Sequence, residues 1–284
     1  MDLRKALLRI ADEPANPALF AIYHDAAVAA AIDDFSSVRK LLQLFAEVAL
    51  AAEPVPLLVS LDDRDLAGQA DRYRRMIDDD EGYRIALGPV NAATREAARL
   101  RIAEAMALIR QSRPDMAEEI AVAARQIVLA DGSAGEQSFS GASSFFLWGA
   151  LVINPAANAD RLTLAETLVH ESGHALLFGL AEAEPLVANR PDERYRSPLR
   201  DDPRPMEGIV HATYVLSRMA KLMEAIAARC ALSDPERAQA AAMAQSSRGL
   251  FLDGLAVVRE HARFTERGRA VLGDWLATSP IPTT

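Results

Sequence analysis

The sequence has little of what marks secreted, membrane-spanning or nucleic-acid-binding proteins. It contains one cysteine, Cys230, which excludes an internal disulfide and is typical of a reducing compartment. Its apolar stretches are too short, or too interrupted by charge, to span a bilayer or to form a signal peptide. Lys and Arg number 31 against 40 Asp and Glu, which disfavours nucleic acid and anionic membranes as partners. We therefore expect a cytoplasmic globular protein that binds neither.

The chain is long and apolar enough to build one large core, because half of its 284 residues are hydrophobic. No repeat or interdomain linker is evident, so we expect a single domain over 1–284. Within it we expect three portions, which are a helical N-terminal portion (1–125), a metal-site core (126–228) and a helical C-terminal portion (229–284).

Strand-like sequence is concentrated in two runs, 126–132 and 145–155, joined by a segment rich in Ser and Gly. The rest of the chain shows mainly helical periodicity. We therefore predict an α+β fold that is predominantly α-helical. A small antiparallel sheet should lie next to a zincin-like metal-binding helix.

The stretch from Thr163 to Gly179 contains the spacing His-Glu-x-x-His on a predicted helix. His170 and His174 are four residues apart, which places their Cβ atoms about 5–6 Å apart on one helical face, close enough to share a metal ion. Glu171 lies beside that face, where it can take a proton or orient a ligand. The first residue of the stretch and Glu166 form a potential capping box. The alternative is a surface helix that carries two histidines by chance.

A second helix, predicted from Pro205 to about residue 228, provides further candidate ligands. Glu207, His211, Tyr214 and Arg218 follow one another at intervals of four, three and four, and form a polar stripe on an otherwise apolar helix. A mononuclear site commonly takes a third protein ligand. We expect that ligand to be His211, with Glu207 as the alternative. Glu207 and Tyr214 are otherwise expected in the shell around the ligands.

The connection between these two helices is long and rich in Pro and Arg. Loops of this length are usually functional or disordered. Arg196, Arg200 and Arg204 concentrate positive charge in an acidic protein, and guanidinium groups bind carboxylates with two parallel hydrogen bonds. The competing interpretation is that these arginines pair with the acidic residues of the same loop, namely Asp192, Glu193, Asp201 and Asp202.

Two reaction classes fit such a site. A zinc peptidase would hold Zn²⁺ on two histidines and a third ligand, with Glu171 taking a proton from the attacking water. Peptidases with a glutamate third ligand have an acidic residue four positions after it, whereas here Glu207 is followed at that distance by His211. Three imidazoles, in contrast, hold Fe(II) as readily as Zn²⁺. An iron site with open positions can bind 2-oxoglutarate, whose distal carboxylate needs a cation such as those of the arginine-rich loop.

Three motifs together resemble a known family. They are Ser-Phe-Ser-Gly before an aromatic run, then LVHESGHALL, then YRSPLRDDPRPMEGIVHATYV. They cover about Ser138 to Val215 and resemble the His-Glu-x-x-His proteins of the biosynthesis of ribosomally synthesised and post-translationally modified peptides (RiPPs). The resemblance implies an Fe(II)- and 2-oxoglutarate-dependent dioxygenase that hydroxylates the β-carbon of residues in a precursor peptide.

The same resemblance implies roles for individual residues. The metal would bind His170, His174 and His211. The cosubstrate carboxylate would bind an arginine of the loop, with Arg204 as the first candidate and Arg200 and Arg196 after it. Glu171 would be a hydrogen-bond acceptor or base beside the metal. We therefore expect a peptide-modifying hydroxylase; a gluzincin-like zinc metallopeptidase and a non-catalytic scaffold that binds a precursor peptide are the alternatives.

Overall fold

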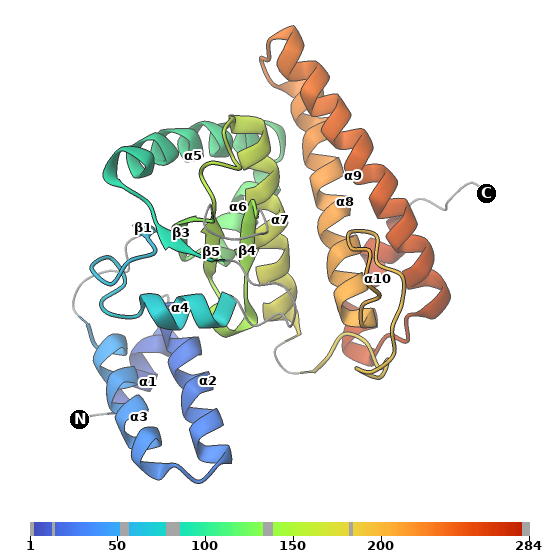
Figure 1. Ribbon diagram of the computed structural model, residues 1–284. Helices are drawn as coiled ribbons and strands as arrows, with labels where there is room; N and C mark the ends of the chain where they lie inside the picture. The colour runs from blue at the N-terminus through green and yellow to red at the C-terminus, as the bar shows by residue number, and fades with distance from the viewer. Residues whose placement is uncertain are drawn as a thin grey trace. The chain divides into compact units, whose positions relative to one another are not determined.

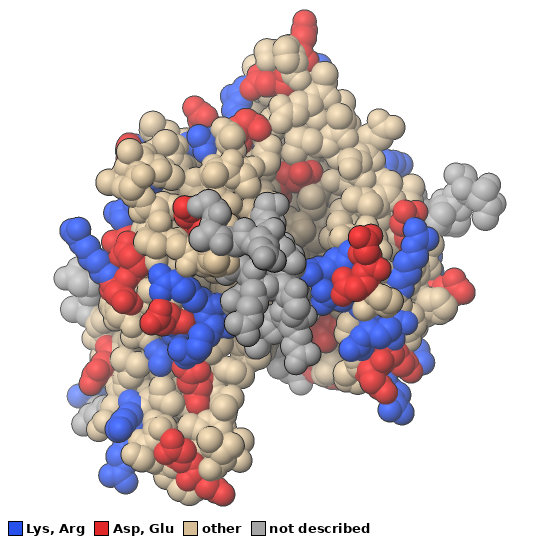
Figure 2. Space-filling model, in the orientation of Figure 1, with Lys and Arg blue, Asp and Glu red and all other residues tan. Residues whose placement is uncertain are grey.

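The computed structural model describes residues 3–12, 15–51, 57–77, 86–132, 139–181 and 184–279 (Figure 1). Most of these residues are helical, as predicted, and a small sheet accompanies them. No described helix is both long and apolar enough to cross a membrane. Acidic and basic side chains are mixed over the face drawn in Figure 2. The chain divides into two compact units, one of Met1–Glu104 with Ile120–Thr167, the other of Ala105–Glu119 with Leu168–Thr284.

The first unit combines helices with the sheet. Its N-terminal helices bury small and branched side chains such as Ala21 and Ile22, which are fully buried. Asp34 caps the third helix by accepting a hydrogen bond from the Ser37 amide at 3.1 Å. The helices of this part are α1 (Leu3–Asp12), α2 (Ala18–Ala31), α3 (Phe35–Ala49) and α4 (Ala70–Ile77).

The sheet is mixed, with the strand order β1-β3-β5-β4 and β2 paired to β3. Strand β3 runs parallel to both β1 and β5, whereas β4 is antiparallel to β5 and β2 is antiparallel to β3. The two central strands are almost entirely buried and consist mainly of aliphatic residues, as is typical of strands covered on both faces. The strands are β1 (Leu58–Ser60), β2 (Gly88–Pro89), β3 (Gln126–Asp131), β4 (Gly141–Ser143) and β5 (Ala150–Ile153).

The prediction of an antiparallel sheet is therefore wrong, because the two main strands, β3 and β5, run parallel to each other. The chain reverses twice between β3 and β5, because β4 intervenes, and β5 therefore returns parallel to β3. The aromatic start of the predicted second strand is a 3₁₀ turn (Phe145–Leu147), and Gly149 adopts φ +93° before the strand begins. Ser138 of the first motif lies outside the described residues.

Helix α7 (Arg161–Leu180) carries the His-Glu-x-x-His motif. The amides of Leu162 and Thr163 both donate to Oδ1 of Asp160 at 2.9 Å, so this aspartate caps the helix. The predicted capping box on Thr163 is wrong, because Thr163 already lies within the first turn. At its other end the helix runs one residue beyond the predicted stop at Gly179.

The second unit contains two long helices, α8 (Met206–Arg229) and α9 (Asp234–His261), which lie side by side (Figure 1). Helix α9 begins with a capping box at Ser233. The Ser233 amide donates to Glu236 at 3.0 Å and the Glu236 amide donates back to the Ser233 hydroxyl at 3.5 Å. Helix α10 (Glu266–Thr278) follows, while α5 (Ala92–Ser112) and α6 (Pro114–Ala123) cross the boundary between the units.

The arginine-rich connection between α7 and α8 is fastened at several points. Tyr195 and Arg204 exchange backbone hydrogen bonds, each 2.9 Å long. Glu193 accepts from Arg263 at 2.8 Å and from the Tyr195 hydroxyl at 2.7 Å. The loop is thereby tied to itself and to the segment between α9 and α10.

The Glu193 carboxylate should make unfolding pH-dependent. Arg263 first, and then the Tyr195 hydroxyl, lower the pKa of Glu193 from 4.5 to about 2. A lowered carboxyl pKa stabilises the fold above the unfolded value, and this stabilisation is lost as the pH falls from about 4.5 towards 2. We expect Glu193→Gln to lower the unfolding temperature at pH 7, and we expect its difference from the parent protein to shrink between pH 4.5 and pH 3. Thermal unfolding across this range tests the expectation, and a difference that is constant down to pH 3 would contradict it.

Candidate metal site

One turn of α7 brings together the two histidines of the motif. The ring centroids of His170 and His174 are 4.9 Å apart, and their Nε2 atoms are 3.2 Å apart. Two nitrogens that each bind one ion at about 2.0–2.1 Å, with an angle between 90° and 109°, lie about 2.8–3.4 Å from each other. The two imidazoles therefore have the spacing of two ligands on a single ion.

Met219 of α8 determines which nitrogen of His170 carries the hydrogen. Its Sδ atom lies 3.2 Å from Nδ1 of His170. A thioether sulfur accepts a weak hydrogen bond and has no hydrogen to donate. His170 therefore donates from Nδ1, and the lone pair stays on Nε2. This is the nitrogen that faces His174 and the one that can bind a metal.

His211, also on α8, lies against the opposite edge of the His174 ring. The angle between the planes of the His174 and His211 rings is 16°, and their Nδ1 atoms are 3.2 Å apart. Phe178, one turn beyond His174 on α7, packs against the His211 ring with 5.3 Å between centroids. The three imidazoles are thus in contact, His174 lying between the other two.

The three imidazoles do not yet converge on one point. His174 presents Nε2 to His170 and Nδ1 to His211, which are different edges of one ring. In the described part of the chain, no three His, Cys, Asp or Glu side chains are arranged to hold one metal ion. For His211 to be a third ligand, one of its ring nitrogens would have to face the edge that His170 and His174 share.

The protonation of the buried rings suits metal binding. Burial lowers the pKa of His211 to about 4. Burial, followed by the neighbouring His170 and His211, holds the pKa of His174 well below its usual 6.5. Neutral imidazole is the form that binds metals, because it keeps one nitrogen lone pair. The donor set therefore fits a divalent ion at neutral pH without first releasing a proton from these two rings.

Glu171 lies next to the paired nitrogens. It is only 5% exposed, and its Oε1 atom is 3.9 Å from Nε2 of His170. A buried carboxylate at this distance can accept a hydrogen bond or a proton from a molecule held between the two histidines. This arrangement is compatible with both roles predicted from the sequence.

Gly173 allows α7 and α8 to come close at this level. A Cβ atom on Gly173 would lie 2.9 Å from Cγ1 of Val215 and 3.3 Å from Cδ of Arg218. Arg218 is itself buried and donates from Nη2 to Glu119 at 2.6 Å. The missing side chain of Gly173 therefore lets His211 and Met219 of α8 reach the histidines of α7.

The remaining predicted residues of α8 have separate surroundings. Glu207 is exposed in the first turn. The guanidinium carbon of Arg218 lies 5.6 Å from the centroid of the Tyr214 ring. The Tyr214 ring also packs edge-on against Trp275. The four residues of the predicted polar stripe therefore do not form one site. Among them, His211 is the residue that contacts a histidine of the motif.

The three arginines predicted to bind a cosubstrate also differ in their surroundings. Arg196 and Arg200 are exposed. Arg204 is half-buried, and its Nε atom lies 2.9 Å from Oδ2 of Asp202. The competing interpretation, pairing within the loop, therefore holds for Arg204.

Sequence reasoning missed Met219, Phe178 and the role of Gly173. Met219 lies eight residues after His211, so helical spacing places it on a similar side of α8 about two turns later, which was a usable signal. Phe178 is four residues after His174 and was equally accessible. Nothing in the sequence distinguished Gly173 from a glycine in open space, because the atoms that its Cβ would meet belong to another helix.

Replacing Gly173 should separate the two helices. We expect Gly173→Ala to lower the free energy of unfolding by about 1–3 kcal/mol, since the new methyl group meets a packed valine. Gly249→Ala on α9 is the matched control, because no atom lies within 4 Å of its Cβ, and it should gain about 0.5–1 kcal/mol. Denaturant unfolding measures both values. Equal stability of the two variants would show that the close approach is unimportant.

Removing the sulfur of Met219 should weaken metal binding. Met219→Leu keeps the side-chain volume but deletes the acceptor for Nδ1 of His170, so we expect affinity for Zn²⁺ to fall at least about tenfold. Met223→Leu, four residues along the same helix and fully buried, is the control and should leave the affinity unchanged. Competition with a chromophoric chelator gives both affinities. A similar affinity in both variants would remove Met219 from the site.

No protein-family model and no curated protein matches the chain.

Proposed function

We propose that this protein is an Fe(II)- and 2-oxoglutarate-dependent dioxygenase that hydroxylates the β-carbon of residues in a ribosomally synthesised precursor peptide in the cytoplasm. The observation that carries the proposal is the contact of His211 with His174, because it favours an all-imidazole ligand set over one completed by Glu207. Glu207, the ligand that a gluzincin-like peptidase would require, is exposed instead. The motif resemblance supplies the reaction class.

The proposed ligands divide into a prepared pair and one residue that must move. His170 and His174 present Nε2 atoms 3.2 Å apart, which is a ligand spacing without further rearrangement. His211 would complete the facial set by turning its ring, and the burial of that ring keeps it neutral for the purpose. Fe(II), when bound, supplies the site for O₂ and for the 2-oxoacid.

The overall reaction balances without any further reductant. One oxygen atom of O₂ enters a C–H bond of the peptide, and the other enters succinate as 2-oxoglutarate loses CO₂. The two electrons removed from the peptide C–H bond and the two from the 2-oxoacid together reduce O₂. The protein's task is therefore to hold the peptide β-carbon and the cosubstrate close to the same ion and to exclude other substrates.

Arg204 is our candidate for the distal carboxylate of 2-oxoglutarate. It is less exposed than Arg196 and Arg200, and its Cβ lies 3.8 Å from where a Cβ on Gly208, in the first turn of α8, would be. It lies two residues before the start of α8, the helix that carries His211. A carboxylate ligand would compete with Asp202 for its guanidinium. Guanidinium groups bind carboxylates with two parallel hydrogen bonds, which suits the distal carboxylate of 2-oxoglutarate.

A zinc metallopeptidase is the second candidate, and the position of Glu171 favours it. This carboxylate is buried 3.9 Å from the ligating nitrogen of His170, where a general base for hydrolysis would be needed. In the oxygenase the same carboxylate would accept a hydrogen bond and would orient the site. Activity of a Glu171→Gln variant therefore separates the two reactions.

The test is anaerobic reconstitution followed by admission of air. With Fe²⁺ and 2-oxoglutarate we expect a weak visible charge-transfer band, formation of succinate, and a gain of one oxygen atom in a peptide encoded beside this gene. His211→Ala should abolish the band, Glu207→Ala should keep it, and Glu171→Gln should keep part of the activity. Peptide cleavage with Zn²⁺ in the absence of a 2-oxoacid, abolished by Glu171→Gln, would establish the peptidase instead. Peptide binding without either reaction would establish the scaffold.

A further inference from the structure

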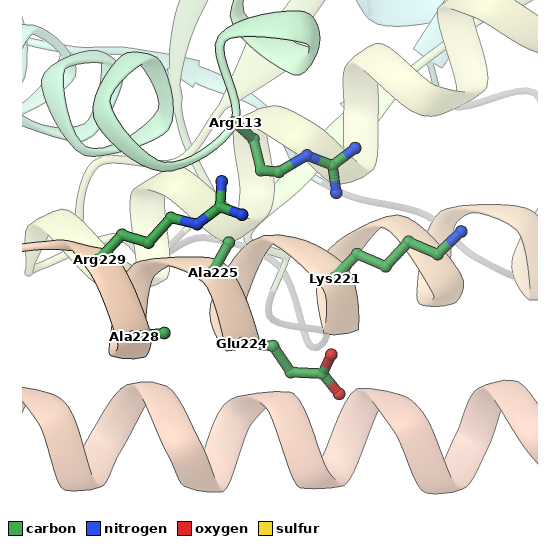
Figure 3. Close-up of a pocket in the computed structure, with 6 residues that line it drawn as sticks. All are labelled: Arg113, Lys221, Glu224, Ala225, Ala228 and Arg229. Atoms are coloured by element: carbon green, nitrogen blue, oxygen red, sulfur yellow. The ribbon is translucent and has the colours of Figure 1, made fainter.

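A cationic pocket lies in the second unit, apart from the three histidines. Its volume is about 460 Å³. The last turns of α8 form one side and the junction between α5 and α6 contributes the other (Figure 3). The lining residues are Arg113, Lys221, Glu224, Ala225, Ala228 and Arg229.

The two arginines of the lining are held in place by neighbours. Arg113 donates from Nε to Oδ1 of Asp115 at 2.9 Å. Arg229 donates from Nη1 to the carbonyl oxygen of Ser112 at 2.8 Å. Figure 3 shows Arg113 extending from the facing segment towards the helix that carries Arg229 and Lys221. Guanidinium groups fixed in this way lose less conformational entropy when they bind a ligand.

Three acidic side chains near the pocket, Asp115, Glu119 and Glu224, are each paired with an arginine. Asp115 binds Arg113, and Glu119 binds Arg218 at 2.6 Å. Glu224, the carboxylate of the lining, accepts from Arg248 of α9 at 3.0 Å, outside the lining. The positive charges of Arg229 and Lys221 are therefore not compensated by these carboxylates. Arg229 is bonded to the neutral carbonyl of Ser112.

Lys221 shows the resulting positive potential. Within the described residues, no hydrogen bond or ion pair engages its ammonium group. Burial, then Arg113 and Arg218, lower the pKa of Lys221, while Glu224 opposes them. Positive neighbours thus outweigh the one negative neighbour at this position. A negatively charged group placed in the pocket would be attracted by the same potential.

We propose that this pocket binds the carboxylate side chains of an acidic peptide segment, and that it anchors the precursor peptide during modification. The choice of a peptide rests on the proposed function. Lys221 is ten residues after His211 on α8, which corresponds to about 15 Å along the helix. An extended peptide covers this distance with about five residues. The acidic anchor therefore lies about five residues from the modified position in the precursor.

Binding can be measured without metal or turnover, so its outcome is separate from that of the proposed reaction. The probe is fluorescently labelled hexaglutamate, titrated into the full-length protein and followed by anisotropy. We expect saturable binding that weakens with salt and that falls at least about tenfold in Lys221→Gln and in Arg229→Gln. Lys40→Gln on α3 is the matched control and should bind as the parent does, since it removes an exposed lysine elsewhere.

Competition distinguishes a peptide carboxylate from a free small anion. Unlabelled hexaglutamate should displace the probe at far lower concentration than inorganic phosphate or 2-oxoglutarate. Displacement by either small anion at equal concentration would overturn the assignment to a peptide. Equal binding by Lys221→Gln, Arg229→Gln and Lys40→Gln would overturn the pocket itself. Circular dichroism of each variant ensures that a lost signal reflects the pocket and not the fold.

Discussion

The close approach of α7 and α8 at Gly173 is the constraint on which the candidate site depends. Any side chain there would meet Cγ1 of Val215 at 2.9 Å, so only glycine allows the two helices their present distance. Two residues of α8 then reach α7 on either side of the contact, His211 at one level and Met219 two turns later. The glycine that permits this packing is part of the motif itself, since Gly173 lies between His170 and His174 in the sequence.

The same contact settles the direction of the hydrogen bonds at His170. Met219 can only accept, so it forces the hydrogen of His170 onto Nδ1 and leaves Nε2 for an ion. Because Nε2 of His170 then has only a lone pair, Nε2 of His174, 3.2 Å away, carries a hydrogen in this arrangement. A bound ion would require that hydrogen to move to Nδ1 of His174, which faces His211. His170 is therefore already in the tautomer that a metal would need. His174 and His211 would have to exchange their donor and acceptor roles. Rotation of His211 would break its contact with His174 and leave the His170 tautomer unchanged.

The local features of the sequence predicted the local structure well. Helical periodicity identified α7, α8 and the helical character of residues 229–284. The direction of β5 could not be predicted, because a three-residue strand and a 3₁₀ turn intervene after β3 and neither has a distinctive pattern. For the site, the spacing of His170 and His174 followed from one helix. The orientation of His211 depends on how two helices pack, which residue spacing within either helix does not determine.

Charge pairing explains how an acidic protein can present a positive pocket. The net charge of -9 is a sum over the whole chain, whereas the potential at Lys221 depends on charges within about one Debye length, 8–10 Å. The nearby carboxylates of Asp115, Glu119 and Glu224 are each bonded to an arginine, so their fields are largely cancelled at short range. The surplus negative charge elsewhere then disfavours non-specific binding of acidic peptides. A local cationic pocket on an acidic protein therefore selects by position, because an anionic peptide gains attraction only where its carboxylates reach that pocket.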